Sequence, residues 1–90
     1  MEIKLLNQKY ELIKNYKDAF NIEELKARYE DYFEKYDYIL GDYAYAKLRL
    51  KGFYNDNNKD VTNINNYKQI DRYITDFCAF DCKYFIIKKK

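Results

Sequence analysis

The residues best suited to chemistry lie in one short segment in which cations and rings alternate with apolar side chains. Residues 45 to 53 read Tyr-Ala-Lys-Leu-Arg-Leu-Lys-Gly-Phe. Alternate residues of a strand point to the same face and stand about 6.6 Å apart. Three cations in such a row could follow a phosphate backbone while the flanking rings stack on bases. The sequence therefore predicts one face that binds nucleic acid or another anion, made of Tyr45, Lys47, Arg49, Lys51 and Phe53.

The same pattern also fits two other interpretations, which the sequence leaves open. In the first, the strand face is simply solvated, and Arg49 forms an ion pair with Asp37 or Asp42. In the second, exposed rings form the contact of a protein–protein adaptor or a small homo-oligomer. The residues of that alternative interface are Asp42 and Tyr43, with Tyr45 and Phe53 as further aromatic anchors.

The composition argues against an enzyme. The chain contains no His and no Ser, so Ser-His-Asp and Cys-His arrangements cannot form. With two Gly residues, neither a dinucleotide fingerprint nor a P-loop can be written. The remaining enzymatic hypothesis places Asp42 with Arg49 or Lys51 on a phosphate-bearing substrate. We expect a non-catalytic binding module without a cofactor or metal, and RNA or the ribosome is its first candidate partner.

The cysteines and the apolar runs bear on where the protein acts. Cys78 and Cys82 have a CxxxC spacing, which fits neither the redox CxxC motif nor a zinc site in a chain without His. We expect both to be reduced thiols that act as small buried apolar residues. No apolar run approaches the roughly 18 residues needed to span a bilayer, and residues 1–6 do not resemble a signal peptide. These features predict a cytoplasmic protein that does not contact the membrane.

Length and composition predict a single domain over residues 1–90. Hydrophobic residues make up 48% of the chain and charged residues 36%, which is typical of a globular protein. Aromatic residues contribute 20%, so we expect a core of large rings with tyrosine hydroxyls at its edge. The net charge of +2 is too small to require a polyanionic partner.

In the first half of the chain, the patterns predict strands, a helix and a hairpin. Short mixed segments at 3–6 and 9–16 indicate a hairpin or one interrupted strand. Asn21 followed by Glu24 has the form of an N-cap, and apolar residues at helical spacing predict a helix over 22–35. Residues 37–42 carry the short apolar run Tyr38-Ile39-Leu40, which Gly41 ends, and this suits a strand buried on both faces, followed by a turn near residues 43–44. The alternating strand would then cover 45–54.

In the second half, a polar loop over 55–66 precedes a helix and a last strand. Asn66 with Gln69 repeats the capping pattern, and a helical stripe follows that ends near Cys78. Residues 82–88 are apolar on both faces at Tyr84 to Ile87, which indicates a central strand. The order strand-helix-strand-strand-helix-strand predicts an α+β fold with a mostly antiparallel sheet and two helices, and it suits a ferredoxin-like domain.

Two runs in the middle of the chain resemble the signature of the YutD-like family of small bacterial proteins. These runs are Tyr36-Asp37-Tyr38-Ile39-Leu40-Gly41-Asp42-Tyr43 and Leu48-Arg49-Leu50-Lys51-Gly52-Phe53-Tyr54. The segments Tyr10-Glu11-Leu12, Arg28-Tyr29 and Cys82-Lys83-Tyr84-Phe85, with Cys78, extend the resemblance over nearly the whole chain. After Gly-Asp, where the family usually has an aromatic residue such as Trp, this chain has Tyr43, and just before the second Cys, where the family favours Gly, it has Asp81. The resemblance implies a cytoplasmic bacterial protein but no activity, cofactor or catalytic residue.

Overall fold

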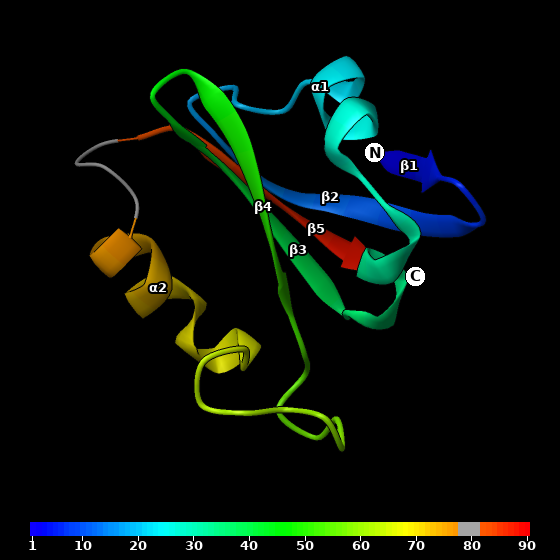
Figure 1. The fold of residues 1–90 in the computed structure, drawn as a ribbon, viewed down its shortest axis with the longest axis vertical. Coiled ribbons are helices and arrows are strands. Elements are labelled where there is room, and N and C mark those ends of the chain that lie inside the picture. The colour runs from blue at the N-terminus through cyan, green and yellow to red at the C-terminus, as the bar shows by residue number, and fades with distance from the viewer. Residues whose placement is uncertain (78–81) are drawn as a thin grey trace.

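The protein folds around a five-stranded antiparallel sheet with a helix on each face (Figure 1). The structure is a computed structural model that describes residues 1–77 and 82–90. The strands are β1 (Glu2–Leu5), β2 (Gln8–Tyr16), β3 (Tyr38–Ala44), β4 (Lys47–Phe53) and β5 (Tyr84–Lys89). The helices are α1 (Ile22–Arg28) and α2 (Ile70–Phe77), each adjoined by a 3₁₀ segment, η1 (Asp31–Lys35) and η2 (Tyr67–Gln69). The predicted α+β class and the antiparallel sheet with two helices are confirmed.

The strand order is β1-β2-β5-β3-β4, which differs from that of a ferredoxin-like sheet. In a ferredoxin-like sheet the first and third of the four main strands lie in the middle. Here β5 and β3, the fourth and second, lie there. The reason is burial, because Tyr84 to Ile87 are buried on both faces of β5, whereas most of β2 is exposed. The ferredoxin-like topology is therefore not observed, and the central position of β5 is confirmed.

The predicted helix over 22–35 is two segments. Asn21 caps α1 as predicted, because its side chain accepts a hydrogen bond of 3.1 Å from the backbone N–H of Glu24. Tyr29 then has extended backbone angles (φ −74°, ψ 135°) and ends the helix. Its side chain lies in the core, where its hydroxyl shares a hydrogen bond of 2.6 Å with that of Tyr10. The chain resumes as η1, which buries Phe33 in the same cluster.

The β3–β4 hairpin turns two residues later than predicted. Tyr45 and Ala46 form its two-residue turn, with positive φ values of 53° and 63°. Gly41, which ends the apolar run, lies inside β3, and the strand continues to Ala44. A Cβ atom at Gly41 would come within 2.3 Å of the Phe85 ring on β5. This glycine therefore makes room for a core ring in the middle of the sheet.

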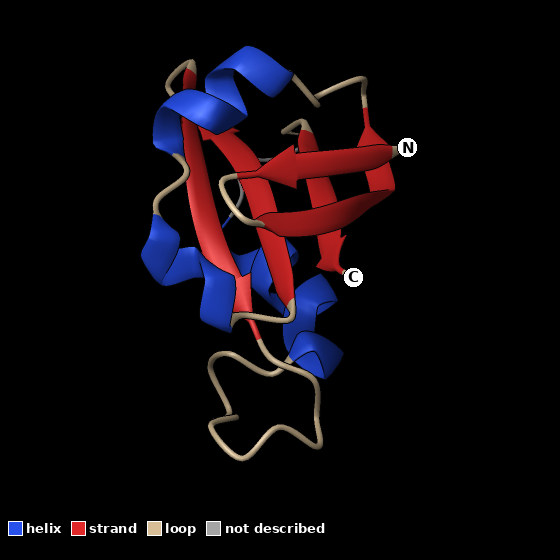
Figure 2. Cartoon of the chain, turned by 90° about the vertical axis from the view of Figure 1, so that its right-hand side faces the viewer, coloured by secondary structure: helices blue, strands red, loops and turns tan. Residues whose placement is uncertain are grey.

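Two hydrophobic clusters cover the two faces of the sheet, and the strands lie between α1 and α2 in Figures 1 and 2. We call these the α1 face and the α2 face. The α1 face includes Leu25, Phe85 and Ile87, which are completely buried. The α2 face includes Leu40, Phe53, Ile70 and Ile86, with rings of η2 and α2 packed against them.

The structure bears on two further expectations, the redox state of the cysteines and the location of the protein. Cys82 is disulfide-bonded, so the prediction of a reduced thiol is wrong at this position. Cys78 lies outside the described residues. Among residues 1–77 and 82–90, none of the helices has the length and hydrophobicity that a membrane span requires. The cytoplasmic location stays a prediction.

Candidate functional site

Four of the five residues of the predicted binding face do share one side of β4. Phe53 belongs to the cluster on the α2 face, and Lys47, Arg49 and Lys51 alternate with it along the strand. We call these four residues the β4 face. Tyr45 is not part of it, because it lies in the hairpin turn, where it is 97% exposed. The prediction that five side chains form one strand face is therefore wrong at Tyr45.

Phe53 is covered by α2. Its side chain is completely buried, and its ring meets that of Tyr73 edge to face with centroids 5.5 Å apart. A base or a partner side chain cannot reach this ring. The prediction of an exposed aromatic anchor at Phe53 is wrong because the second helix packs over this end of the β4 face.

Arg49 forms an ion pair with Asp42, directly opposite it in the β3–β4 register. The distance between Arg49 Nη2 and Asp42 Oδ2 is 2.5 Å, and the same nitrogen donates a hydrogen bond of 3.2 Å to the carbonyl oxygen of Phe77. The hydrogen bond to Asp42 raises the pKa of the Arg49 guanidinium above its usual value. One of the two predicted ion pairs is thus confirmed, and it ties the hairpin to the end of α2.

Asp42 and Tyr43 do not form a common exposed interface. Asp42 is only 2% exposed, so it is not a surface residue. Tyr43 follows it in β3 and therefore points to the α1 face, where it is half-buried. The ammonium group of Lys83 lies 4.3 Å from the centre of the Tyr43 ring. The alternative interface predicted from these two residues is wrong in its geometry.

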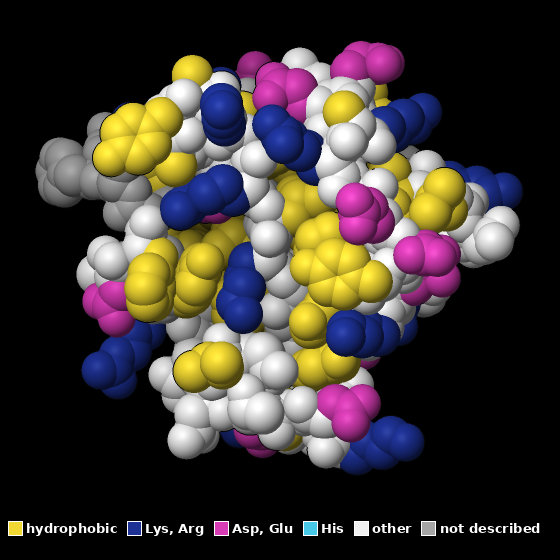
Figure 3. Space-filling model, in the orientation of Figure 1, with side chains coloured by type: hydrophobic (Ala, Val, Ile, Leu, Met, Phe, Trp, Pro, Cys, Tyr) yellow, Lys and Arg dark blue, Asp and Glu magenta, His cyan; other side chains and the backbone are white. Residues whose placement is uncertain are grey.

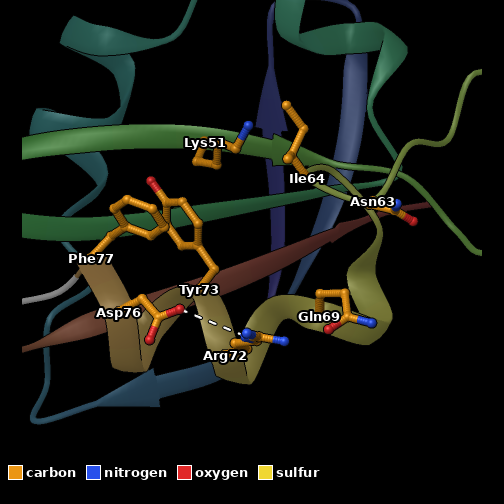
Figure 4. A pocket seen from close by; sticks show the side chains of 8 residues that line it. All are labelled: Lys51, Asn63, Ile64, Gln69, Arg72, Tyr73, Asp76 and Phe77. Carbon is orange, nitrogen blue, oxygen red and sulfur yellow. Dashed lines mark ion pairs between the residues drawn. The ribbon is translucent and has the colours of Figure 1, made fainter.

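A groove of 680 Å³ lies beside the β4 face, between β4, the loop before η2, and α2. We call it the α2 groove; its lining residues, all labelled in Figure 4, are Lys51, Asn63, Ile64, Gln69, Arg72, Tyr73, Asp76 and Phe77. The Tyr73 and Phe77 rings stack with centroids 4.8 Å apart. Figure 3 shows hydrophobic side chains beside basic ones in this part of the surface.

Two large apolar residues that line the groove, Ile64 and Phe77, were not among the site residues predicted from the sequence. Ile64 is 76% exposed and Phe77 is 63% exposed, and both of these large apolar side chains line the same groove. Ile64 could have been noticed as one of few apolar residues in a polar loop. Phe77 lies at the end of the helical stripe, and its spacing alone assigns it to the core.

The α2 groove and the adjoining β4 face carry lysine charges that form no ion pair within the residues that the structure describes. Arg72 is 3.8 Å from Asp76 in an exposed ion pair one helical turn long. Lys51 lies at the groove, and its ammonium group is 5.7 Å from the centre of the Phe53 ring. Across the described parts of the chain, neither Lys47 nor Lys51 forms an ion pair. An acidic group on a partner would find both ammonium groups available.

The groove has the chemistry of a contact surface. Burial raises the pKa of the Tyr73 hydroxyl above its ordinary value, so this group stays neutral well beyond neutral pH. Asp42, the carboxylate of the enzymatic hypothesis, is buried beside Arg49. No cluster of three potential metal ligands occurs in the residues that the structure describes. Apolar walls with a basic rim suit binding of a side chain or segment of another molecule.

Comparison with known proteins agrees with the resemblance found in the sequence. A family model described as "YutD-like: Putative antitoxin YutD-like" matches residues 4–88. A curated relative from Bacillus subtilis (strain 168), named "Putative antitoxin YutD", is 47% identical over 87 residues, which are 97% of this chain and 96% of the relative. The solution NMR structure of protein yutD from B. subtilis matches with a TM-score of 0.83 and 46% identity, over 100% of this chain and 82% of that one. The chain therefore belongs to the YutD-like family.

Proposed function

We propose that this protein is a non-catalytic module that binds a protein partner through the α2 groove. The observation that carries the proposal is the pair of strongly exposed apolar side chains, Ile64 and Phe77, on the walls of one groove. Exposed apolar residues are usually scattered, and their concentration in a hollow with a polar rim is typical of protein contacts. The name of the B. subtilis relative, "Putative antitoxin YutD", supports this direction, because an antitoxin-like name suggests a protein partner.

RNA binding through the β4 face is the second candidate. Lys47 is exposed, and neither it nor Lys51 forms an ion pair within the described residues. Arg49, however, is paired with Asp42, and the Phe53 ring is buried. Two phosphate contacts on single-stranded RNA predict that log K changes with log salt concentration with a slope of only about −1.4. A face without a stacking ring would give weak binding, so we place the protein partner first.

Affinity purification from cells that express the full chain, followed by quantitative mass spectrometry, tests the proposal. We compare the natural chain with Ile64→Asp plus Phe77→Asp, which places two charges in the α2 groove. The control is Leu6→Asp, because Leu6 is 59% exposed in the β1–β2 turn, far along the chain from the groove, and its φ of 53° suits Asp. The proposal is supported by a protein that copurifies with the natural chain and the control, and whose recovery falls by about tenfold or more with the double variant.

The contrary outcomes identify the alternatives. If the same proteins copurify with all three chains, the α2 groove is not the contact surface. If only RNA is recovered, and ribonuclease removes everything else, the RNA hypothesis replaces ours. Light scattering after size exclusion covers the homo-oligomer: a dimer that the double variant converts to a monomer would make a second copy of this chain the partner.

A further inference from the structure

The outer edge of β4 carries backbone groups that the sheet does not use. β4 is the last strand in the order β1-β2-β5-β3-β4, so only β3 pairs with it. Ala44 and Lys47 flank the two-residue turn and form the hydrogen-bonded pair that closes the hairpin. Hydrogen-bonded pairs recur at every second position of an antiparallel ladder. The N–H and C=O groups of Leu48, Leu50 and Gly52 therefore point away from the sheet.

The residue after β4 confirms this direction and shows what the edge accepts. Tyr54 continues the outward series. Its N–H donates a hydrogen bond of 2.7 Å to the carbonyl oxygen of Asn65, and its own carbonyl oxygen accepts one of 2.9 Å from the N–H of Tyr67. The chain thus adds a single parallel bridge, Tyr54 to Asn66, to this edge before it enters η2. Within the described residues, no further backbone segment bonds the edge at Leu48, Leu50 or Gly52.

We propose that β4 accepts an extended acidic segment of the protein partner as an additional strand, in line with the bridge that residues 65–67 begin. The inference rests on the proposed function and names the mode in which the partner binds. In strand addition, main-chain hydrogen bonds supply affinity, and the pockets that receive alternate side chains supply specificity. Leu48, Leu50 and Gly52 would supply those main-chain bonds.

Charge determines which segment fits. Side chains directly opposite one another on neighbouring strands lie about 5 Å apart, so a strand added to β4 places alternate side chains beside Lys47, Arg49 and Lys51. Arg49 is already neutralised by Asp42, whereas Lys47 and Lys51 form no ion pair within the described residues. Glu or Asp opposite the two lysines would pair with both of them, and an apolar side chain opposite Arg49, two residues from each acid and on the same face, would lie toward the α2 groove.

The same lysines argue against a second copy of this chain as the added strand. Pairing β4 with the β4 of another copy would bring its cations close to one another, and like charges on paired strands are destabilising. Lysine on an edge strand is a known device against self-association. The edge is therefore open to a partner of opposite charge.

Backbone substitution at Leu50 tests the inference. Leu50→Pro removes an outward N–H and leaves the hydrogen bonds to β3 intact, and proline is tolerated at such edge positions. Leu50→Ala is the matched control, since it shortens the side chain but keeps the N–H. In the affinity purification described above, we expect recovery of the partner to be about tenfold lower with Leu50→Pro than with Leu50→Ala. Equal recovery with the two variants would overturn strand addition.

A peptide titration covers the case in which Leu50→Pro does not fold. The probe is an acetylated peptide of about eight residues in which Glu alternates with Val, and a Lys-Val peptide of equal length is the charge-reversed control. With the natural chain, we expect the Glu-Val peptide to slow hydrogen exchange at the amides of Leu48, Leu50 and Gly52, and the Lys-Val peptide to leave them unchanged. Equal effects of both peptides, or no slowing at these three amides, would refute the inference.

The two proposals fail in different ways. If Ile64→Asp plus Phe77→Asp releases the partner but Leu50→Pro retains it as well as Leu50→Ala does, the α2 groove is a protein-binding site and strand addition is wrong. If the double variant retains the partner, the proposed function itself is wrong.

Discussion

The two faces of the sheet are completed in different ways. On the α1 face, α1 and η1 close the surface, and the hydroxyls of the buried Tyr10 and Tyr29 bond each other. On the α2 face, Phe53 and Leu40 are equally buried, but the last turn of α2 leaves Phe77 at the surface beside the α2 groove. A closed face contributes mainly to stability, whereas a half-covered face keeps apolar surface for a partner. The difference can be tested one side chain at a time.

The largest effect should come from the closed side, at Phe85. Its ring is completely buried, lies against Gly41, and meets Phe20 edge to face at 5.3 Å. Phe85→Ala should lower the free energy of unfolding by about 3–5 kcal/mol, because the variant loses apolar burial and leaves a cavity. Urea unfolding followed by circular dichroism measures the change. Phe77→Ala is the matched control on the open side and should lower it by only about 0.5 kcal/mol. Equal losses of stability in the two variants would show that the two faces do not differ in how completely they are covered.

Elements that depend on neighbouring residues in the chain could be predicted from the sequence. The Asn21 cap, the polar loop over 55–66 and the two-sided apolar run of β5 all appear where their patterns indicate them. Features that depend on distant residues could not. Tyr29 ends α1 and its hydroxyl meets that of Tyr10, 19 positions earlier, while Gly41 leaves room inside β3 for the ring of Phe85.

The next effect should come from the ion pair at the boundary of the open side. Arg49→Ala leaves the buried carboxylate of Asp42 without the guanidinium, which should lower the free energy of unfolding by about 1–3 kcal/mol. This expected loss of stability is smaller than for a fully buried ion pair because the Arg49 side chain is 45% exposed. Adding Asp42→Asn removes the buried charge, so the double variant should regain part of the loss. Urea unfolding of the three variants gives the coupling energy, and simple additivity would contradict this role for the pair.

The candidate site could be predicted only in part, because some of its features also depend on residues distant in the sequence. The alternation along β4 is local, and it correctly placed Lys47, Arg49, Lys51 and Phe53 on one face. Whether that face is exposed to solvent depends on where α2 packs, and the residue spacing within β4 cannot predict the position of α2. The sequence offered Asp37 and Asp42 as partners of Arg49. The structure pairs Arg49 with Asp42, while Asp37 accepts hydrogen bonds from Asn55 and Asn58.

A smaller effect is expected at the hydroxyl pair on the closed side. Tyr10→Phe removes the hydrogen bond to Tyr29 and should lower the free energy of unfolding by about 1 kcal/mol. Tyr29→Phe alone and the double variant complete the cycle, again by urea unfolding. If removing both hydroxyls is as harmful as the sum of the single changes, the two groups do not act as a pair.

The same hydroxyls predict a loss of stability at high pH. Burial, and then the hydrogen bond to Tyr29, raises the pKa of Tyr10 above its ordinary value of about 10. Tyrosine is neutral when protonated, so below about pH 10 both the folded and the unfolded chain keep the proton and stability is unaffected. Above that pH the unfolded chain releases it first, and the free energy of unfolding falls by up to about 1.4 kcal/mol per pH unit. Tyr10→Phe should show a shallower fall between about pH 10 and 11, and an unchanged slope would contradict this assignment.

The smallest effect on stability should occur at Ile64, on the open side, where the effect on binding should be large. Ile64 is 76% exposed, so Ile64→Asp should change the free energy of unfolding by no more than about 0.5 kcal/mol. Recovery of the protein partner should nonetheless fall, because a carboxylate would have to be buried against the apolar wall of the α2 groove. A stability loss as large as that of Arg49→Ala would show that Ile64 packs against the fold. It would then belong with the closed side, and the groove would lose one of the two side chains on which its proposed role depends.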